Sequence, residues 1–126
     1  MENLIIKGTD TLPSVLLGTN GEIKLEGRAL LENAAKFFQP LYTWAQEFTS
    51  EEVNITINLE YFNTSVSKHL YDFLKIFDEN PSNKEINLTW MYEEGDDEMQ
   101  ESGEIYKDLL SRTNFGFKQY AEILNK

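Results

Sequence analysis

Apolar and polar residues alternate along two stretches of the chain, at residues 53–61 and 86–92. Successive side chains of a β-strand point to opposite faces, so this period of two predicts two strands that each have one apolar face. Apolar runs between turn-forming residues predict three further short strands, at residues 4–7, 13–17 and 23–26.

The second and third of these short strands flank a turn at residues 18–21. The Asn20-Gly21 pair in this turn predicts a β-hairpin, because both residue types tolerate the positive φ that a tight turn requires. Gly27 and Arg28, which follow the hairpin, indicate that the strand ends there.

Apolar residues that recur three and four positions apart predict three helices, at residues 32–48, 65–79 and 97–110. Pro40 lies inside the first of them. It is expected to kink that helix or divide it in two, because proline lacks the N–H group that a helix interior uses. Residues 115–124 fit either a last strand or a short helix.

Both alternating strands have a polar face. A parallel strand that is covered on both faces is almost continuously apolar, and these two are not. We therefore expect an α/β (α+β) fold, with a mixed β-sheet, helices packed mainly on one face and the other face largely open. A doubly wound nucleotide-binding fold is disfavoured for the same reason. The polar residues of the two strands are Asn54, Thr56, Asn58, Glu60, Asn87 and Thr89.

The 126 residues have a net charge of −11, from 22 acidic and 11 basic side chains. We expect one domain over residues 1–126. The negative charge disfavours nucleic acids and anionic membranes as partners, and favours a protein with a basic face. The absence of cysteine excludes disulfides, thiolate nucleophiles and cysteine-based metal sites. Without a signal peptide or an apolar run of about 20 residues, a cytoplasmic protein is expected.

Residues 93–98 form an acidic run. It lacks the spacing of an EF-hand loop, so Asp96, Asp97 and Glu98 are expected to stabilise the positive end of the following helix. An acidic docking surface or weak divalent binding remains an alternative. The single histidine, His69, does not share a helical face with Thr64 or Ser67. We therefore predict no catalytic triad, no catalytic residue and no cofactor.

Three hydroxyl groups, those of Thr64, Ser65 and Ser67, occur where a strand ends and a helix is expected to begin. Asn63 or Thr64 is expected to cap this helix. One cap does not require all three hydroxyls, and a helix N-terminus is also favourable for a phosphate group. Phosphorylation there would add a charge of about −1.5 to −2 and change which partners can bind that surface. The pattern thus suggests a regulated binding surface without selecting one hydroxyl.

Residues 60–65, with the sequence Glu-Tyr-Phe-Asn-Thr-Ser, are the most specific part of a resemblance to the SiaC family of regulatory phosphoproteins. The resemblance extends over nearly the whole chain. Leu30-Leu31 departs from it, because the family pattern has Tyr-Pro before Glu32-Asn33, and the segment after Phe117 is longer and less typical. Other matching segments are residues 6–9, 11–13, 27–28, 32–33, 59–68, 90–94, 96–99 and 103–104.

This resemblance implies a STAS-like fold, as in anti-sigma-factor antagonists. It implies that Thr64 is phosphorylated by a histidine-kinase-like Ser/Thr kinase and dephosphorylated by a metal-dependent PP2C-type phosphatase. It also implies that the unmodified protein binds and stimulates a diguanylate cyclase, in bacterial cyclic di-GMP signalling. Partner contacts are expected from the residues around Thr64, namely Tyr61, Phe62, Asn63, Ser65, Val66, Ser67 and Lys68.

Two alternatives belong to other functional classes. A small-ligand-binding module of STAS-like fold, without phospho-switching, would use a pocket lined by Tyr61, Trp90 and Tyr92. An enzyme would use a divalent metal held by the acidic run at residues 96–98. Neither alternative has a positive sequence motif.

Overall fold

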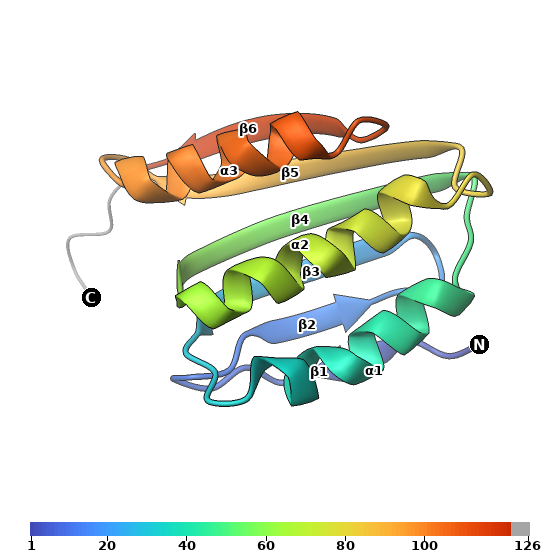
Figure 1. The fold of residues 1–126 in the computed structure, drawn as a ribbon, viewed down its shortest axis with the longest axis horizontal. Helices are drawn as coiled ribbons and strands as arrows, with labels where there is room; N and C mark the ends of the chain where they lie inside the picture. The colour runs from blue at the N-terminus through green and yellow to red at the C-terminus, as the bar shows by residue number, and fades with distance from the viewer. Residues whose placement is uncertain (122–126) are drawn as a thin grey trace.

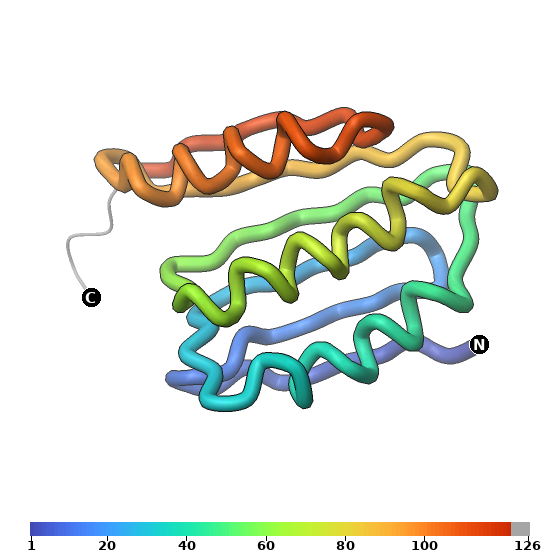
Figure 2. Tube along the Cα trace, in the orientation of Figure 1, coloured from blue at the N-terminus to red at the C-terminus, as the bar shows by residue number. Residues whose placement is uncertain are grey.

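The computed structural model describes residues 1–121. Their single sheet has six strands in the order of the sequence, β1-β2-β3-β4-β5-β6. β1 to β3 pair antiparallel, and β3 to β6 pair parallel. Figure 2 traces the chain from the N-terminus at one edge of the sheet to β6 at the other. The elements are β1 Leu4–Ile6, β2 Ser14–Leu17, β3 Glu22–Ala29, α1 Ala34–Glu47, β4 Glu52–Phe62, α2 Thr64–Glu79, β5 Glu85–Glu93, α3 Asp97–Leu109 and β6 Asn114–Tyr120.

Each helix connects two neighbouring parallel strands, α1 from β3 to β4, α2 from β4 to β5 and α3 from β5 to β6. Such crossovers are right-handed, so steps that always move to the next strand in the same direction place every helix on one face. Figure 1 shows the three helices side by side in front of the sheet. Because the strand order never reverses within residues 1–121, this part of the chain lacks the switch point where doubly wound folds bind nucleotides.

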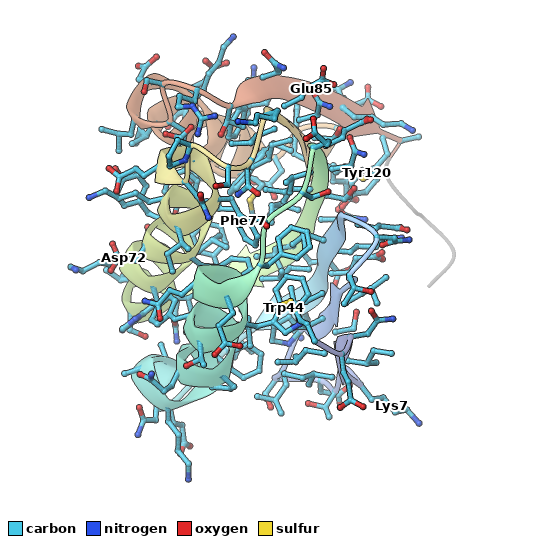
Figure 3. The ribbon with its side chains drawn as sticks, turned by 90° about the vertical axis from the view of Figure 1, so that its right-hand side faces the viewer. Lys7, Trp44, Asp72, Phe77, Glu85 and Tyr120 are labelled. Atoms are coloured by element: carbon cyan, nitrogen blue, oxygen red, sulfur yellow. The ribbon has the colours of Figure 1, made fainter. Side chains whose placement is uncertain are left out.

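The core lies between the helices and the sheet, and Figure 3 shows Trp44 and Phe77 in this layer. The other face of the sheet is open, with Glu85 and Tyr120 on it (Figure 3). An asparagine ladder crosses that face. Asn114 Nδ2 donates to Asn87 Oδ1 over 3.0 Å, and Asn87 Nδ2 donates to Asn54 Oδ1 over 3.1 Å. The predicted one-sided mixed sheet is confirmed.

The predicted hairpin is confirmed as β2 and β3. Gly21 has a φ of 96°, and a Cβ atom there would lie 2.4 Å from the carbonyl oxygen of Glu52, so this position requires glycine. The predicted end of the strand at Gly27 and Arg28 is wrong. β3 continues to Ala29, with a register shift between Gly27 and Arg28 where it pairs with β4.

Of the two outcomes expected at Pro40, a kink or a division of the first helix, division does not occur, because α1 runs unbroken from Ala34 to Glu47. One face of α1 buries Phe38, Leu41 and Trp44, and this packing outweighs the hydrogen bond that proline cannot make. The last predicted segment, residues 115–124, is a strand as far as Tyr120. Residues 122–124 of that prediction lie outside the described residues.

Arg112 holds the C-terminal end of α2 against the start of β6. Its guanidinium group donates to the carbonyl oxygens of Asp78, Asn80 and Asn83, over 2.7, 2.9 and 2.6 Å. In return, the carboxylate of Asp78 accepts from the Arg112 N–H and from the Thr113 hydroxyl. A cation at this position also stabilises the negative end of the helix dipole.

Candidate functional site

The site predicted from the sequence lies at the start of α2, at the C-terminal ends of the parallel strands (Figure 1). Asn63 caps the helix, and its Oδ1 accepts the N–H of Val66 over 3.2 Å. Asn63 Nδ2 donates to the carbonyl oxygen of Leu31 over 3.2 Å, and its backbone N–H donates to that of Ala29. The start of α2 is therefore tied to the last residue of β3 and to the segment that follows it.

The three hydroxyl groups are in different situations. Ser67 Oγ lies 3.0 Å from the Tyr106 hydroxyl of α3, and that hydroxyl donates to the Ser67 carbonyl oxygen over 2.7 Å. The Ser65 hydroxyl donates to Asn63 Oδ1 over 3.0 Å. Thr64 is the first residue of α2 and is exposed, and its hydroxyl makes no hydrogen bond within residues 1–121. Thr64 thus presents the freest hydroxyl of the three.

Tyr106 connects the start of α2 to α3. Burial raises the pKa of its hydroxyl above the usual value, against the opposing effect of the hydrogen bond with Ser67. The hydroxyl therefore stays protonated as a donor to the Ser67 carbonyl oxygen. Its ring also stacks on Tyr71 of α2, with centroids 6.2 Å apart. The Ser67 hydroxyl is consequently part of the contact between two helices.

The other predicted contact residues divide between surface and core. Tyr61 is 48% exposed, and Lys68 is exposed and pairs with Asp72 over 3.2 Å. Phe62 is half-buried and packs edge-on against Trp90. Val66 is 0% exposed, so its side chain is not at the surface of this structure. Its valine side chain belongs to the apolar stripe that fastens α2 to the sheet.

A bulge in β4 explains the placement of Tyr61 and Phe62. Gly27 pairs with Leu59 and Arg28 pairs with Tyr61, so Glu60 has no partner on β3. The alternation that buries Leu59 is thereby shifted by one residue, and Phe62 turns towards the core. Tyr61 is left exposed next to the start of α2.

Sequence reasoning missed the residues that position this site from elsewhere in the chain. Leu31 and Ala29 act through backbone oxygens, which any residue could supply. Tyr106 lies in the helix predicted at residues 97–110, but helical periodicity does not reveal its hydrogen bond to Ser67, 39 residues away. Gly27, with a φ of 108°, was the one local signal of the bulge.

An apolar groove lies beside the site, with a volume of about 580 Å³. It shares Leu31 with the hydrogen bond that holds Asn63, so its wall and the cap of α2 are directly connected. The surface around Thr64 therefore has an apolar part as well as a polar one. The groove is lined by Ile6, Thr11, Leu12, Leu30, Leu31, Glu32, Asn33, Lys36, Phe37 and Pro40.

The structure bears on both alternatives drawn from the sequence. Trp90 is 0% exposed and donates its indole N–H to the Met99 carbonyl oxygen, so it cannot line an open pocket with Tyr61 and Tyr92. Asp96 caps α3 by accepting the Met99 N–H, and Asp97 and Glu98 occupy the first turn, as predicted. Within residues 1–121, no three acidic or histidine side chains converge as metal ligands.

Comparison with known proteins identifies a family. A model of the SiaC family of regulatory phosphoproteins matches residues 6–120. A search of the curated proteins found no match. No helix within residues 1–121 has the length and apolar character to span a membrane.

Solved structures share the fold. The crystal structure of apo-SiaC from Pseudomonas aeruginosa matches with a TM-score of 0.82 at 24% identity, covering 94% of this chain and 99% of that one. A chain in the crystal structure of the diguanylate cyclase SiaD in complex with its activator SiaC, from the same organism, matches with a TM-score of 0.78 at 23% identity, covering 94% and 99%. Another SiaC structure from P. aeruginosa matches with a TM-score of 0.78 at 23% identity, covering 97% and 100%.

Proposed function

This chain belongs to the SiaC family of regulatory phosphoproteins, and we propose that it is a partner-switching protein controlled by phosphorylation at Thr64. In this proposal the unmodified form binds and regulates an effector protein. A phosphate group on Thr64 reverses that binding. No catalytic step is assigned to the chain itself.

The observation that carries this proposal is the contrast between the hydroxyls of residues 64 to 67. Ser67 is bonded to Tyr106 and Ser65 to Asn63, whereas Thr64 is exposed at the first position of α2. A kinase must bring the acceptor hydroxyl into its own active site, so an exposed hydroxyl without an internal partner is the favourable substrate. This geometry supports Thr64 over its neighbours, independently of the family resemblance.

The position also favours a switch that leaves α2 folded. A phosphate at a helix N-terminus interacts favourably with the free N–H groups and the positive end of the dipole. It adds a charge of about −1.5 to −2 to a chain whose net charge is already −11. Placed beside the apolar groove and Tyr61, that charge would have to be desolvated in any close contact there. The phosphate would therefore release the effector by changing the binding surface, while α2 stays folded.

The partners follow from this mechanism and from the relatives. We propose a histidine-kinase-like Ser/Thr kinase that adds the phosphate and a PP2C-type phosphatase that removes it. We propose a diguanylate cyclase as the effector, since a structural neighbour is a complex of such a cyclase with its activator SiaC. Contacts would come from the surface around Thr64, namely Tyr61, Phe62, Asn63, Ser65, Ser67 and Lys68.

A charge placed at Thr64 tests the effector step. Thr64→Asp retains a helix-stabilising residue at the start of α2, so a loss of binding would not reflect unfolding. Thr19→Asp is the matched control. Thr19 is exposed in the β2–β3 turn, at the end of the sheet opposite to the start of α2. Each tagged variant is expressed in the native bacterium, and the co-purified diguanylate cyclase is quantified by mass spectrometry and by its activity.

We expect the wild type and Thr19→Asp to retain a cyclase, and Thr64→Asp to retain at least about tenfold less of it. Equal recovery by all three proteins would contradict control at Thr64. Failure of all three to retain a cyclase would contradict the proposed effector.

A further inference from the structure

Two large apolar side chains on α3 are exposed to solvent without an evident structural role. Ile105 is 59% exposed and Leu109 is 52% exposed. They lie four residues apart, one turn along the helix, which places them about 6 Å apart along its axis. The core-facing side of α3 instead uses Met99, Gly103 and Tyr106.

The neighbours of α3 show which way these two side chains face. Lys107 lies over the ring of Phe117 in β6, 5.8 Å from its centroid, so that side of α3 faces the edge of the sheet. Ile105 and Leu109 are each two residues from Lys107, about 200° around the helix. They therefore lie on the side nearer α2, where Tyr106 stacks on Tyr71. Figure 1 shows α2 and α3 next to each other in the helical layer.

The helix that contains this pair is strongly negative. α3 and its cap contain six carboxylates and one lysine. The ion pairs within residues 1–121 join Lys24 to Glu26, Lys68 to Asp72 and Lys75 to Glu79, and none of them includes a carboxylate of α3. We define the α3 flank by its two apolar side chains and the carboxylates next to them, which are Glu98, Glu101, Ile105, Asp108 and Leu109.

We propose that the α3 flank binds a positively charged amphipathic helix of a partner protein. Apolar side chains on one face of that helix would cover Ile105 and Leu109, and its lysine or arginine side chains would pair with the surrounding carboxylates. Carboxylates alone would attract any cation, whereas the exposed apolar pair selects a segment with an apolar face. A second copy of this chain is a poor occupant, because two molecules of charge −11 repel each other.

A synthetic helical peptide of leucine and lysine, with its leucines on one face, is a direct probe. Its binding is measured by fluorescence anisotropy, and amide shifts in a ¹⁵N NMR spectrum locate the site. The control peptide has the same composition in an order that spreads the leucines around the helix. Ile105→Ser with Leu109→Ser removes the apolar pair, and Ile5→Ser is the matched control, because Ile5 is 71% exposed on β1.

We expect the amphipathic peptide to shift amides of α3 and to bind the double variant at least about tenfold more weakly than the wild type or Ile5→Ser. Added salt should weaken binding. Thr64→Ala should bind like the wild type, which separates this proposal from the switch. Equal binding of the control peptide, or unchanged affinity of the double variant, would overturn the proposal. So would self-association of the wild type that the double variant abolishes.

Discussion

Thr64 and Ser67 lie about one helical turn apart, yet their hydroxyl groups differ in hydrogen bonding and exposure. The Ser67 hydroxyl is bonded to Tyr106, whereas the Thr64 hydroxyl faces solvent. Local sequence predicts that a helix begins near these residues, because Asn63 is a favourable cap. It does not predict which hydroxyl is free, since that depends on a tyrosine brought there by the fold. The tertiary structure thus determines which hydroxyl is free, and the residue types alone do not.

Tyr42 illustrates a residue whose ionisation depends on the contact between two helices. Its hydroxyl lies 2.7 Å from His69 Nδ1 and 3.1 Å from the His69 carbonyl oxygen, joining α1 to α2. Burial, with a smaller effect of the negative charge of Asp72, raises the pKa of Tyr42 from 10.0 to about 12. The folded state therefore holds this proton more tightly than the unfolded state does.

This difference predicts a pH dependence of stability. The contribution of Tyr42 is fully present below pH 10 and is lost as the pH rises towards about 12, because the unfolded chain loses the proton first. We expect the free energy of unfolding to fall over this range, and to fall less steeply in Tyr42→Phe. Urea denaturation at a series of pH values measures both slopes. Tyr61→Phe, at an exposed tyrosine, is the control, and a slope in Tyr42→Phe equal to the wild type would contradict this account.

At the scale of elements, α1 contains a residue that its secondary structure does not favour. Pro40 is exposed, seven positions into the helix, where its nitrogen cannot donate to the carbonyl oxygen of Lys36. The sequence pattern identified this conflict, but the division of the helix that it allowed does not occur. The buried face of α1 packs against β-strands that are remote in sequence, and local propensity does not include that stabilisation.

We therefore expect Pro40→Ala to stabilise the protein, by about 1–3 kcal/mol, because it restores a helical hydrogen bond and removes a steric conflict. Thermal unfolding followed by circular dichroism measures the shift. Gln39→Ala, at the neighbouring exposed position, should change the melting temperature little. A melting temperature of Pro40→Ala at or below that of the wild type would contradict this explanation.

β4 shows how far a strand can be predicted from its pattern. The alternation of residues 53 to 59 identified the strand and its buried face, because each buried side chain recurs every second position. The bulge at Glu60 was not predicted, since an extra residue in one strand is defined only by its pairing with another. That bulge lies directly before the candidate site, so pattern reasoning failed where the function is proposed.

At the scale of the whole molecule, polar residues on the best strands predicted a sheet covered on one face, and the structure has this form (Figure 3). The order of the strands was not predictable from these patterns. It follows from three successive crossovers in one direction, which also place every helix in one layer. The start of α2 and the α3 flank are consequently both in the helical layer. We propose that this layer is the one that partners contact.

The phosphate on Thr64 is the central claim, and phosphorylation of the protein from its own cells is the most direct measurement of it. Intact-mass spectrometry across growth conditions counts phosphate groups, and fragmentation of the peptide that contains residues 63 to 67 locates them. We predict a fraction with a single phosphate on Thr64, absent from Thr64→Ala and retained in Ser65→Ala and Ser67→Ala. A phosphate on a different residue, or unmodified protein under every condition in which its kinase is expressed, would contradict the account.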